Sequence, residues 1–225
     1  MQGAVRCGAA SEVVALLPKL WQLTRDPMHR RTSEAAQRNR DAILAVLKRV
    51  LPARGRVLEI ASGSGEHALA FATALSGLTW QPSERDAEGL ASIEAWRAEL
   101  GPANLLPPVE LDVLRRPWPV MEADAIVCIN MIHIAPWAAC EALLRGAGAL
   151  LRPGAPLYLY GAMKLEGRFT APSNADFDAS LRARDPSWGV RDLADVTTAA
   201  QAEGLVLAEV VPMLANNFSL ILRRV

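Results

Sequence analysis

Hydrophobic and polar residues alternate along the chain in a pattern that predicts helices and strands in turn. Apolar residues recur every three to four positions over residues 32–51, which predicts a helix with Ser33 as its N-cap and Pro52 after its end. Farther along, short apolar runs bounded by Gly or Pro predict strands, and longer amphipathic stretches predict helices. The expected strands are 56–61, 78–82, 105–113, 123–130, 156–161, 205–213 and 217–224, and the expected helices among them are 66–77, 86–101, 136–154 and 190–204.

This order of elements predicts an α/β fold. Five strands joined mainly by helices favour a parallel sheet with right-handed crossovers. The last two strands have no helix between them, so they are expected to form an antiparallel hairpin at one side. The fold class is therefore a doubly wound, mostly parallel sheet with a reversed terminal strand. Residues 32–225 are expected to form one domain, and residues 1–31 a partly flexible N-terminal extension.

The bulk composition narrows the class of partner. The chain has 225 residues, of which 51% are hydrophobic and 21% charged, as expected for one globular domain. The 24 Lys and Arg residues balance 24 Asp and Glu residues, so the net charge gives no footprint for nucleic acid or for an anionic membrane. No stretch approaches the about 18 apolar residues of a membrane span.

The cysteines point to a reducing compartment. Cys7, Cys128 and Cys140 are too few and too poorly spaced for a disulfide framework or a zinc site. We expect them to be reduced, small apolar residues in a cytoplasmic protein, and we expect no metal.

A glycine turn follows the first expected strand. Gly63, Gly65 and Ala68 fit the pattern G-x-G-x-x-G/A, in which the first glycines allow a tight turn and the close approach of a ligand. In doubly wound sheets, ligands bind at the carboxyl ends of the strands, near the point where the strand order reverses. Taken alone, such a turn can also be purely structural.

An acidic residue just before this turn separates two classes of nucleotide site. A dinucleotide pyrophosphate needs bare backbone amides at the helix N-terminus, and the carboxylate of Glu59 would repel it. S-adenosylmethionine carries an ammonium group, a sulfonium and a ribose, but no phosphate. The pattern Glu59-x-Ala61-x-Gly63-x-Gly65 therefore favours S-adenosylmethionine over NAD.

Two further acids end the second and third expected strands. Glu84 can accept hydrogen bonds from ribose hydroxyls, and Asp112 can reach the exocyclic amine of adenine. Either acid alone is more typical of a solvated loop. Three acids at successive strand ends, in register with a glycine turn, predict a nucleoside site.

The chain resembles the methyltransferase-like protein 26 family over about residues 35–225. The resemblance is carried by the blocks "LEIASGSGEHA", "WQPSERD", "CINMIHIAPW", "SNADFDASLRARDPSWGVRD" and "PMLANNFSLILRR". It implies a class I S-adenosylmethionine-dependent methyltransferase fold with a seven-stranded sheet. It also implies a methionine end lined by Glu59, Gly63 and Gly65, a ribose held by Glu84 where the family usually has Asp, an adenine beside Asp112, and a wall formed by Asn130 and Met131.

Two residues after the fourth expected strand are candidates for the methyl acceptor. His133 would act as a base or an orienting group for an acceptor hydroxyl or amine, and the alternative is a buried histidine bonded to backbone. Trp137 would cap the acceptor pocket, and the alternative is a core residue. Arg38 and Asn39, in the first helix, are candidates for the cofactor's carboxylate, although a solvated helix surface explains them better.

The segment 161–189 reads as an unusually long loop after the fifth strand, and such loops tend to be lids or binding segments. In one alternative, Asn174 and Asp176 cap a helix that starts near Phe177, and Arg182, Asp185 and Arg191 pair on the surface. Turn chemistry also explains the asparagines before the last strand. The acceptor-binding candidates in and around this loop are Tyr160, Arg168, Asn174, Asp176, Trp188 and Asn217.

These observations predict a methyltransferase that uses S-adenosylmethionine to methylate oxygen or nitrogen of a small-molecule acceptor. Neither nucleic acid nor a membrane is expected as a partner, and the oligomeric state stays open. The first alternative is a non-catalytic partner subunit with a methyltransferase fold. The second, an NAD-dependent oxidoreductase, is disfavoured by Glu59.

Overall fold

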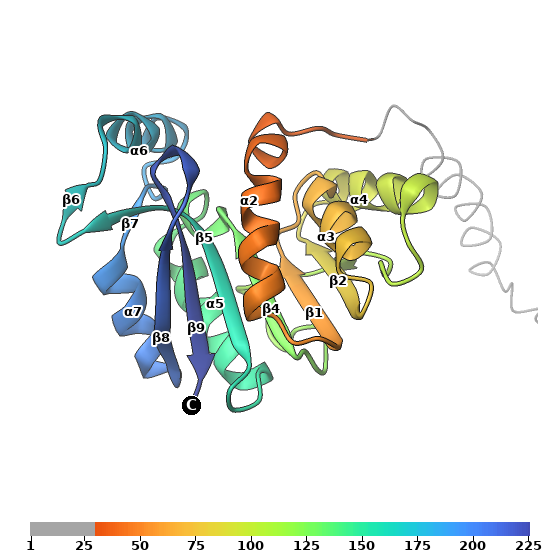
Figure 1. The fold of residues 1–225 in the computed structure, drawn as a ribbon. Helices are drawn as coiled ribbons and strands as arrows, with labels where there is room; N and C mark the ends of the chain where they lie inside the picture. The colour runs from red at the N-terminus through yellow and green to blue at the C-terminus, as the bar shows by residue number, and fades with distance from the viewer. Residues whose placement is uncertain (1–29) are drawn as a thin grey trace, which may run out of the picture.

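The computed structural model describes residues 30–225 as a central sheet covered by helices on both faces (Figure 1). The strands are β1 Gly55–Ile60, β2 Leu78–Glu84, β3 Val109–Glu110, β4 Ala125–Ile129, β5 Pro156–Leu165, β6 Arg168–Phe169, β7 Arg191–Asp192, β8 Leu205–Pro212 and β9 Asn217–Arg224. The helices are α2 Glu34–Val50, α3 Glu66–Ala74, α4 Ala87–Leu100, α5 Trp137–Leu150, α6 Pro172–Arg184 and α7 Leu193–Ala202, with the short 3₁₀ helices η2 Met131–His133 and η3 Leu214–Asn216. The predictions for residues 1–29, Cys7 included, lie outside the described residues.

Within these residues the sheet has nine strands, and its main path is β3-β2-β1-β4-β5-β9-β8. The neighbours from β3 to β5 pair in parallel, whereas β9 runs antiparallel to both β5 and β8. The seven expected strands are therefore present, and the predicted doubly wound α/β class with a reversed last strand is confirmed. The short strands β6 and β7 pair with the end of β5.

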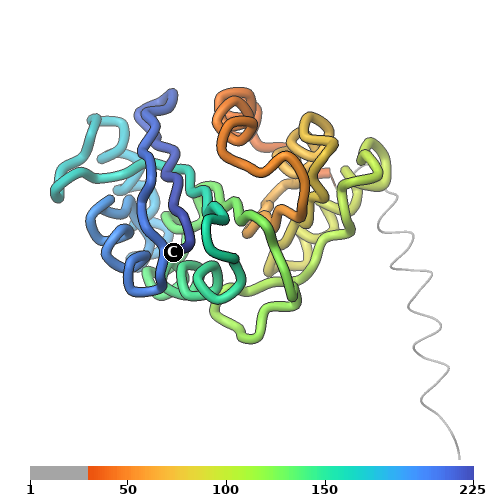
Figure 2. The backbone as a smooth tube through the Cα atoms, turned by 60° about the horizontal axis from the view of Figure 1, so that its bottom comes forward, coloured from red at the N-terminus to blue at the C-terminus, as the bar shows by residue number. Residues whose placement is uncertain are grey.

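The two faces of the sheet bury separate hydrophobic cores. On one face, Ile43 and Leu47 of α2 and Phe71 of α3 pack over Trp80 of β2. On the other face, α5 and α7 cover a core that includes the free cysteines Cys128 and Cys140, which are buried as predicted. Figure 2 shows the early segments of the chain on one side of the molecule and the late strands β8 and β9 on the other, with β4 and β5 between them.

The order of the strands creates the crevice in which this fold class binds ligands. The chain lays down β1, β2 and β3 outward in one direction and then crosses back to place β4 on the other side of β1. The loops that leave β1 and β4 therefore diverge, and a gap opens at the carboxyl ends of these strands.

No helix within residues 30–225 is long and apolar enough to cross a membrane.

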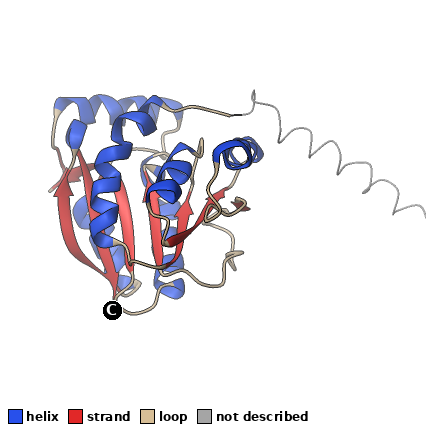
Figure 3. Ribbon diagram, turned by 45° about the vertical axis from the view of Figure 1, so that its right-hand side comes forward, coloured by secondary structure: helices blue, strands red, loops and turns tan. Residues whose placement is uncertain are grey.

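The prediction of a long irregular loop over residues 161–189 is wrong. β5 continues to Leu165, and Glu166 and Gly167 turn the chain at φ +52° and +77° into β6. α6 follows and lies across the end of the sheet (Figure 3). It begins with Pro172, a residue favoured in the first turn, so the helix starts earlier than the alternative near Phe177.

Candidate functional site

The turn after β1 places three residues in the left-handed region, namely Ala61, Gly63 and Gly65. Gly63 has φ +60°, and a Cβ added there would meet nothing within 4 Å, because the residue faces a cavity. Gly65, at φ +89°, caps α3, and its Cβ would lie 2.9 Å from the Cα atom of Ile93. The first glycine therefore keeps the cavity open, and the second allows α3 and α4 to pack closely.

Glu84, the last residue of β2, fixes the shape of this turn. Its Oε2 atom accepts a hydrogen bond from the Gly63 amide at 2.9 Å, and its Oε1 atom accepts one from the Arg85 amide at 2.7 Å. The side chain is buried, and the lack of a Cβ at Gly89 leaves room for it, since a Cβ there would lie 2.4 Å from the Glu84 Cγ atom. The carboxylate is thus held in place before any ligand arrives.

Glu59 lies in β1, on the face of the sheet that α2 and α3 cover. Its Oε2 atom accepts a hydrogen bond from Trp80 Nε1 at 2.8 Å, and the residue is 2% exposed. Burial raises the pKa of Glu59 to about 7, although the Trp80 hydrogen bond opposes the shift. Glu59 does not line the cavity. Its carboxylate could therefore affect a ligand there only by its charge across the glycine turn, or after a change in the shape of that turn.

A cavity of about 320 Å³ opens where the carboxyl ends of β1, β2 and β4 meet the segment after β3. Glu84 and Asp112 make its acidic side, and Asp112 Oδ1 accepts a hydrogen bond from the Leu114 amide at 3.0 Å. Most of the apolar lining comes from the end of β4 and from the β3–β4 and β4–α5 connections, namely Leu111, Val113, Leu114, Ile129, Met131, Ile134 and Ala135. The predicted site residues that line this cavity are Ala61, Gly63, Glu84, Asp112, Met131 and Trp188.

The hydrophobic pattern gave no signal for Arg31, which also lines this cavity. Its amide donates to Ser92 Oγ at 2.9 Å, and its carbonyl accepts from Trp96 Nε1 at 3.1 Å, so the backbone is tied to α4. Ser92 Oγ in turn donates to the carbonyl of Ser64 in the glycine turn at 2.7 Å. Arg31 therefore lies beside the turn, although the sequence places it in the expected N-terminal extension. Asp86 and Arg184, also lining residues, were missed as well.

The two residues predicted for the cofactor's carboxylate do not line the cavity. Arg38 is exposed and pairs with Glu34 of its own helix at 3.2 Å. Asn39 is buried, and its Oδ1 atom lies 2.8 Å from His67 Nε2. This hydrogen bond joins α2 to α3, and burial lowers the pKa of His67 to about 4.

His133 and Asn130 also lie away from the cavity surface. Asn130 adopts φ +61°, and its backbone amide donates to the Tyr160 carbonyl at 2.8 Å. The His133 side chain is fully buried, neither ring nitrogen has a hydrogen-bond partner among the described residues, and burial lowers its pKa to about 3. The imidazole is therefore neutral at physiological pH, and its role toward an acceptor stays a prediction.

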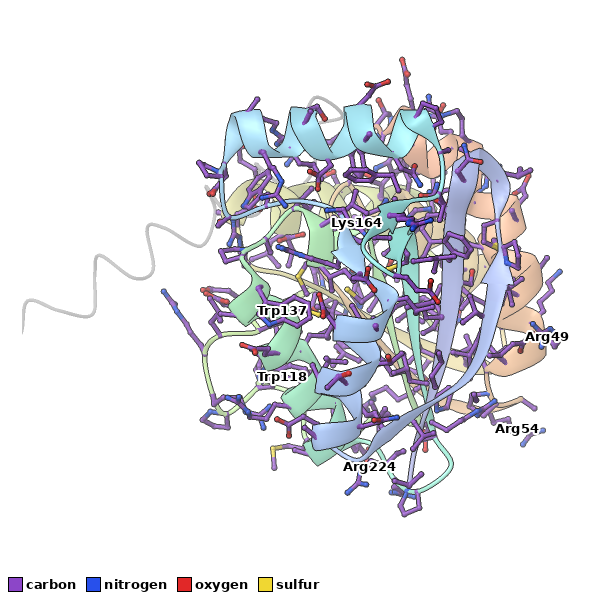
Figure 4. All side chains as sticks on the ribbon, turned by 90° about the vertical axis from the view of Figure 1, so that its left-hand side faces the viewer. Arg49, Arg54, Trp118, Trp137, Lys164 and Arg224 are labelled. Carbon is purple, nitrogen blue, oxygen red and sulfur yellow. The ribbon has the colours of Figure 1, made fainter. Side chains whose placement is uncertain are left out.

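The remaining acceptor-binding candidates are spread over three places. Trp137 lines a separate open groove, together with Lys164, on the face shown in Figure 4. Tyr160 is buried, and its hydroxyl accepts a hydrogen bond from Asn217 Nδ2 at 3.1 Å. Arg168 and Asp176 are exposed.

The alternative roles considered for the segment around α6 are met only in part, since Arg182 does pair with an acid, Asp178, at 2.8 Å. Asn174 lies inside α6 rather than at the cap of this helix. The side-chain amide of Asn174 donates to the Asn216 backbone carbonyl at 2.9 Å, and this bond joins the helix to the β8–β9 hairpin. Arg191 forms no ion pair with an acid within residues 30–225. Its guanidinium donates to the carbonyls of Ile132 at 2.9 Å and Ala135 at 2.6 Å.

Gly63→Ala is expected to weaken S-adenosylhomocysteine binding at least tenfold, because the added methyl group would stand in the cavity. The left-handed backbone should cost only about 1 kcal/mol of folding stability, since the methyl group meets no protein atom. Gly154→Ala is the matched control, because Gly154 has φ +83° and equal space but lies in the turn before β5. Calorimetric titration and thermal unfolding measure both effects. Equal cofactor affinity in the two variants would contradict the placement of the ligand against Gly63.

A family model described as "protein of unknown function (DUF938)" matches residues 30–224. The chain belongs to this family. The matched range starts at the residue where the described structure begins, so the family's shared sequence includes Arg31 and the whole sheet.

Solved methyltransferase structures share the fold at low sequence identity. The mitomycin 7-O-methyltransferase MmcR has a TM-score of 0.74 and 17% identity, over 92% of this chain and 60% of that one. Human N-acetylserotonin methyltransferase in complex with SAM has a TM-score of 0.71 and 13% identity, over 96% and 60%. The SAH-bound form of CalO1, a methyltransferase in calicheamicin biosynthesis, has a TM-score of 0.68 and 20% identity, over 96% and 59%.

The DUF938 chain thus spans about six-tenths of the length of these structures, and at such identities the likeness shows the fold alone. That fold is the class I, Rossmann-like α/β arrangement, as the sequence predicts.

Proposed function

We propose that this protein binds S-adenosylmethionine in the cavity beside Gly63 and transfers its methyl group to oxygen or nitrogen of a small molecule. The cavity volume of about 320 Å³ lies within the range of small-molecule sites. Its acidic side and its apolar wall match a ribose and an adenine ring, respectively. Two of the structures with a similar fold contain this class of cofactor: CalO1 contains SAH, and human N-acetylserotonin methyltransferase contains SAM.

The hydrogen bond from the Gly63 amide to Glu84 is the observation that carries the proposal. In a dinucleotide site, amides at this turn bind the pyrophosphate. Here the amide donates to a carboxylate at 2.9 Å, and that carboxylate would repel a phosphate group at the same place. The chemistry of the turn therefore favours a nucleoside without phosphate.

Each part of the cofactor has a matching group in the chain. Glu84 would accept hydrogen bonds from the ribose hydroxyls, and Asp112 would accept one from the adenine amine. Arg31, fixed beside the turn, would pair with the methionine carboxylate in place of the predicted Arg38 and Asn39. Glu59 would favour the ammonium group from beneath the turn.

S-adenosylmethionine supplies a methyl group on a sulfonium ion, which a nucleophile displaces directly. The protein mainly has to align the acceptor and exclude water. The names of two neighbours, a mitomycin 7-O-methyltransferase and an N-acetylserotonin methyltransferase, favour a small-molecule acceptor. Membership of the methyltransferase-like protein 26 family and a cytoplasmic location belong to the same proposal.

The first experiment is a calorimetric titration of the purified protein with S-adenosylhomocysteine, with NAD as the control. We expect micromolar binding of S-adenosylhomocysteine and none of NAD. Binding of NAD alone, or of neither ligand, would contradict the proposal. Incubation of cofactor-loaded protein with metabolite extracts and labelled methyl donor then separates an enzyme from a non-catalytic partner subunit, because only the enzyme labels a small molecule.

A further inference from the structure

Three arginines that have no ion-pair or backbone partner within residues 30–225 line the candidate cofactor cavity. Most arginine side chains of residues 30–225 pair with an acid or donate to backbone carbonyls. The arginines whose side chains show neither interaction in this part of the chain are Arg31, Arg54, Arg85, Arg116, Arg152, Arg168 and Arg184. Three of these, Arg31, Arg85 and Arg184, line the same cavity although they come from distant segments. Within the described residues these three guanidinium groups form no ion pair, so each can meet a ligand, although the acids Glu84, Asp86 and Asp112 line the same cavity.

These three arginines stand at different parts of the cavity. Arg31 lies beside the glycine turn, where the proposed function assigns it to the cofactor's carboxylate. Arg85 follows Glu84 at the proposed ribose end. Arg184 comes from the end of α6, and its guanidinium carbon lies 4.9 Å from the centre of the Trp188 ring. The cofactor leaves Arg184 and its aromatic neighbour without an assigned role.

The backbone that carries Arg184 and Trp188 is firmly held. The Trp188 amide donates to the Asp185 carbonyl, and Asp185 Oδ1 accepts hydrogen bonds from the amide and the hydroxyl of Ser187 at 2.8 and 2.6 Å. Among the described residues, Asp185 forms no ion pair with Arg184. The Gly189 amide donates to the His133 carbonyl at 2.9 Å.

Two side chains complete this anchoring. Asp178 Oδ1 accepts a hydrogen bond from the Val190 amide at 2.7 Å, and the Arg191 guanidinium donates to carbonyls of the β4–α5 connection. The segment is thus fixed on both sides of the pair, and the pair is presented to the cavity without a large ordering cost.

Charge and shape together define what such a pair recognises. A guanidinium stacked on an aromatic ring keeps its N–H edge free, and this edge matches a carboxylate in a bidentate way. The indole of Trp188 is half-buried, and Ile134, which lines the same cavity, is 40% exposed, so both offer apolar surface to a flat ring.

We infer that the methyl acceptor is a planar organic acid whose carboxylate binds Arg184 and whose ring packs against Trp188. This inference rests on the proposed function, since it assigns the acceptor of the same cavity. It requires that the acid form of a ligand bind better than a neutral form of the same shape.

The test compares 4-hydroxybenzoate with its neutral isostere 4-hydroxybenzamide, and 4-hydroxycinnamate with its amide. Each is titrated by NMR into full-length protein saturated with S-adenosylhomocysteine. We expect at least one acid to bind tenfold or more tightly than its amide. Arg184→Gln should abolish this preference and leave the S-adenosylhomocysteine dissociation constant within twofold. Arg152→Gln should change neither, because Arg152 is exposed, does not line the cavity and has no side-chain partner within residues 30–225.

Other results overturn the inference in recognisable ways. If S-adenosylhomocysteine binds but no acid is preferred over its amide, the acceptor assignment fails while the proposed cofactor stands. If Arg184→Gln weakens S-adenosylhomocysteine itself, the pair belongs to the cofactor site rather than to the acceptor. If S-adenosylhomocysteine does not bind to wild-type protein, the proposed function fails and the inference fails with it.

Discussion

Glu59→Gln is expected to stabilise the protein at pH 8 by about 3 kcal/mol. At that pH the wild-type carboxylate is ionised inside the sheet, where it is 2% exposed and no basic side chain of the described residues bonds to it. Burial raises its pKa from 4.5 to about 7, and each pKa unit corresponds to about 1.4 kcal/mol. Glutamine has nearly the same shape, keeps an oxygen for Trp80 Nε1, and removes the buried charge.

The sign of this effect depends on pH. Because the folded-state pKa of Glu59 lies above the unfolded value, its stabilising contribution is fully present below pH 4.5 and is lost as the pH rises through about 7. His67 and His133 act in the opposite sense, since burial lowers their pKa values from 6.5 to about 4 and about 3. Their contribution is present above pH 6.5 and is lost as the pH falls. Wild type and the Glu59 variant share both histidines, so the histidine contributions cancel when their free energies of unfolding are compared at the same pH.

Urea unfolding at a series of pH values measures this difference. The free energies of unfolding of wild type and Glu59→Gln should nearly coincide at pH 4.5 and separate progressively up to pH 8. Glu122→Gln, at an exposed acid, is the control and should follow wild type throughout. A constant difference across the range would mean that Glu59 titrates as an ordinary carboxylate, and the burial argument would then be wrong.

Local patterns in the sequence were enough to predict several residues that line the candidate cavity. The glycine turn, Glu84 and Asp112 each stand at a strand end, and the parallel order of the strands brings strand ends together. Strand periodicity also predicts the burial of Glu59, because that residue lies within an apolar run. The sheet class followed from the order of elements in the same way.

Contacts between distant segments account for what the sequence did not reveal. Arg31 reaches the cavity because Ser92 and Trp96 hold its backbone, and no spacing rule links position 31 to those residues. Arg184 reaches it because α6 folds across the sheet, whereas the pattern suggested a long loop, in which Trp188 but not Arg184 was a candidate. Periodicity places His133 after β4 but does not show that its side chain turns away from the cavity and toward Gly161.

Glu84→Gln is expected to weaken S-adenosylhomocysteine binding by about 1.5–3 kcal/mol, the range for hydrogen bonds to a charged group. This corresponds to a loss of affinity of roughly ten- to 150-fold. The amide oxygen of glutamine can still accept one of the two backbone hydrogen bonds that Glu84 accepts from Gly63 and Arg85, so the turn keeps part of its support. The charge that would favour the ribose hydroxyls is lost.

The matched control for this variant is Glu110→Gln. Glu110 pairs with Glu84 in the register of β2 and β3, but its side chain is exposed and does not line the cavity. Calorimetric titration should show unchanged affinity in Glu110→Gln and the predicted loss in Glu84→Gln, with thermal unfolding confirming that both variants are folded. Wild-type affinity in a folded Glu84→Gln would remove Glu84 from the ribose role, and its role would then be confined to the backbone hydrogen bonds from Gly63 and Arg85. A loss of affinity confined to Glu84→Gln would instead establish that the carboxylate that shapes the glycine turn also binds the nucleoside.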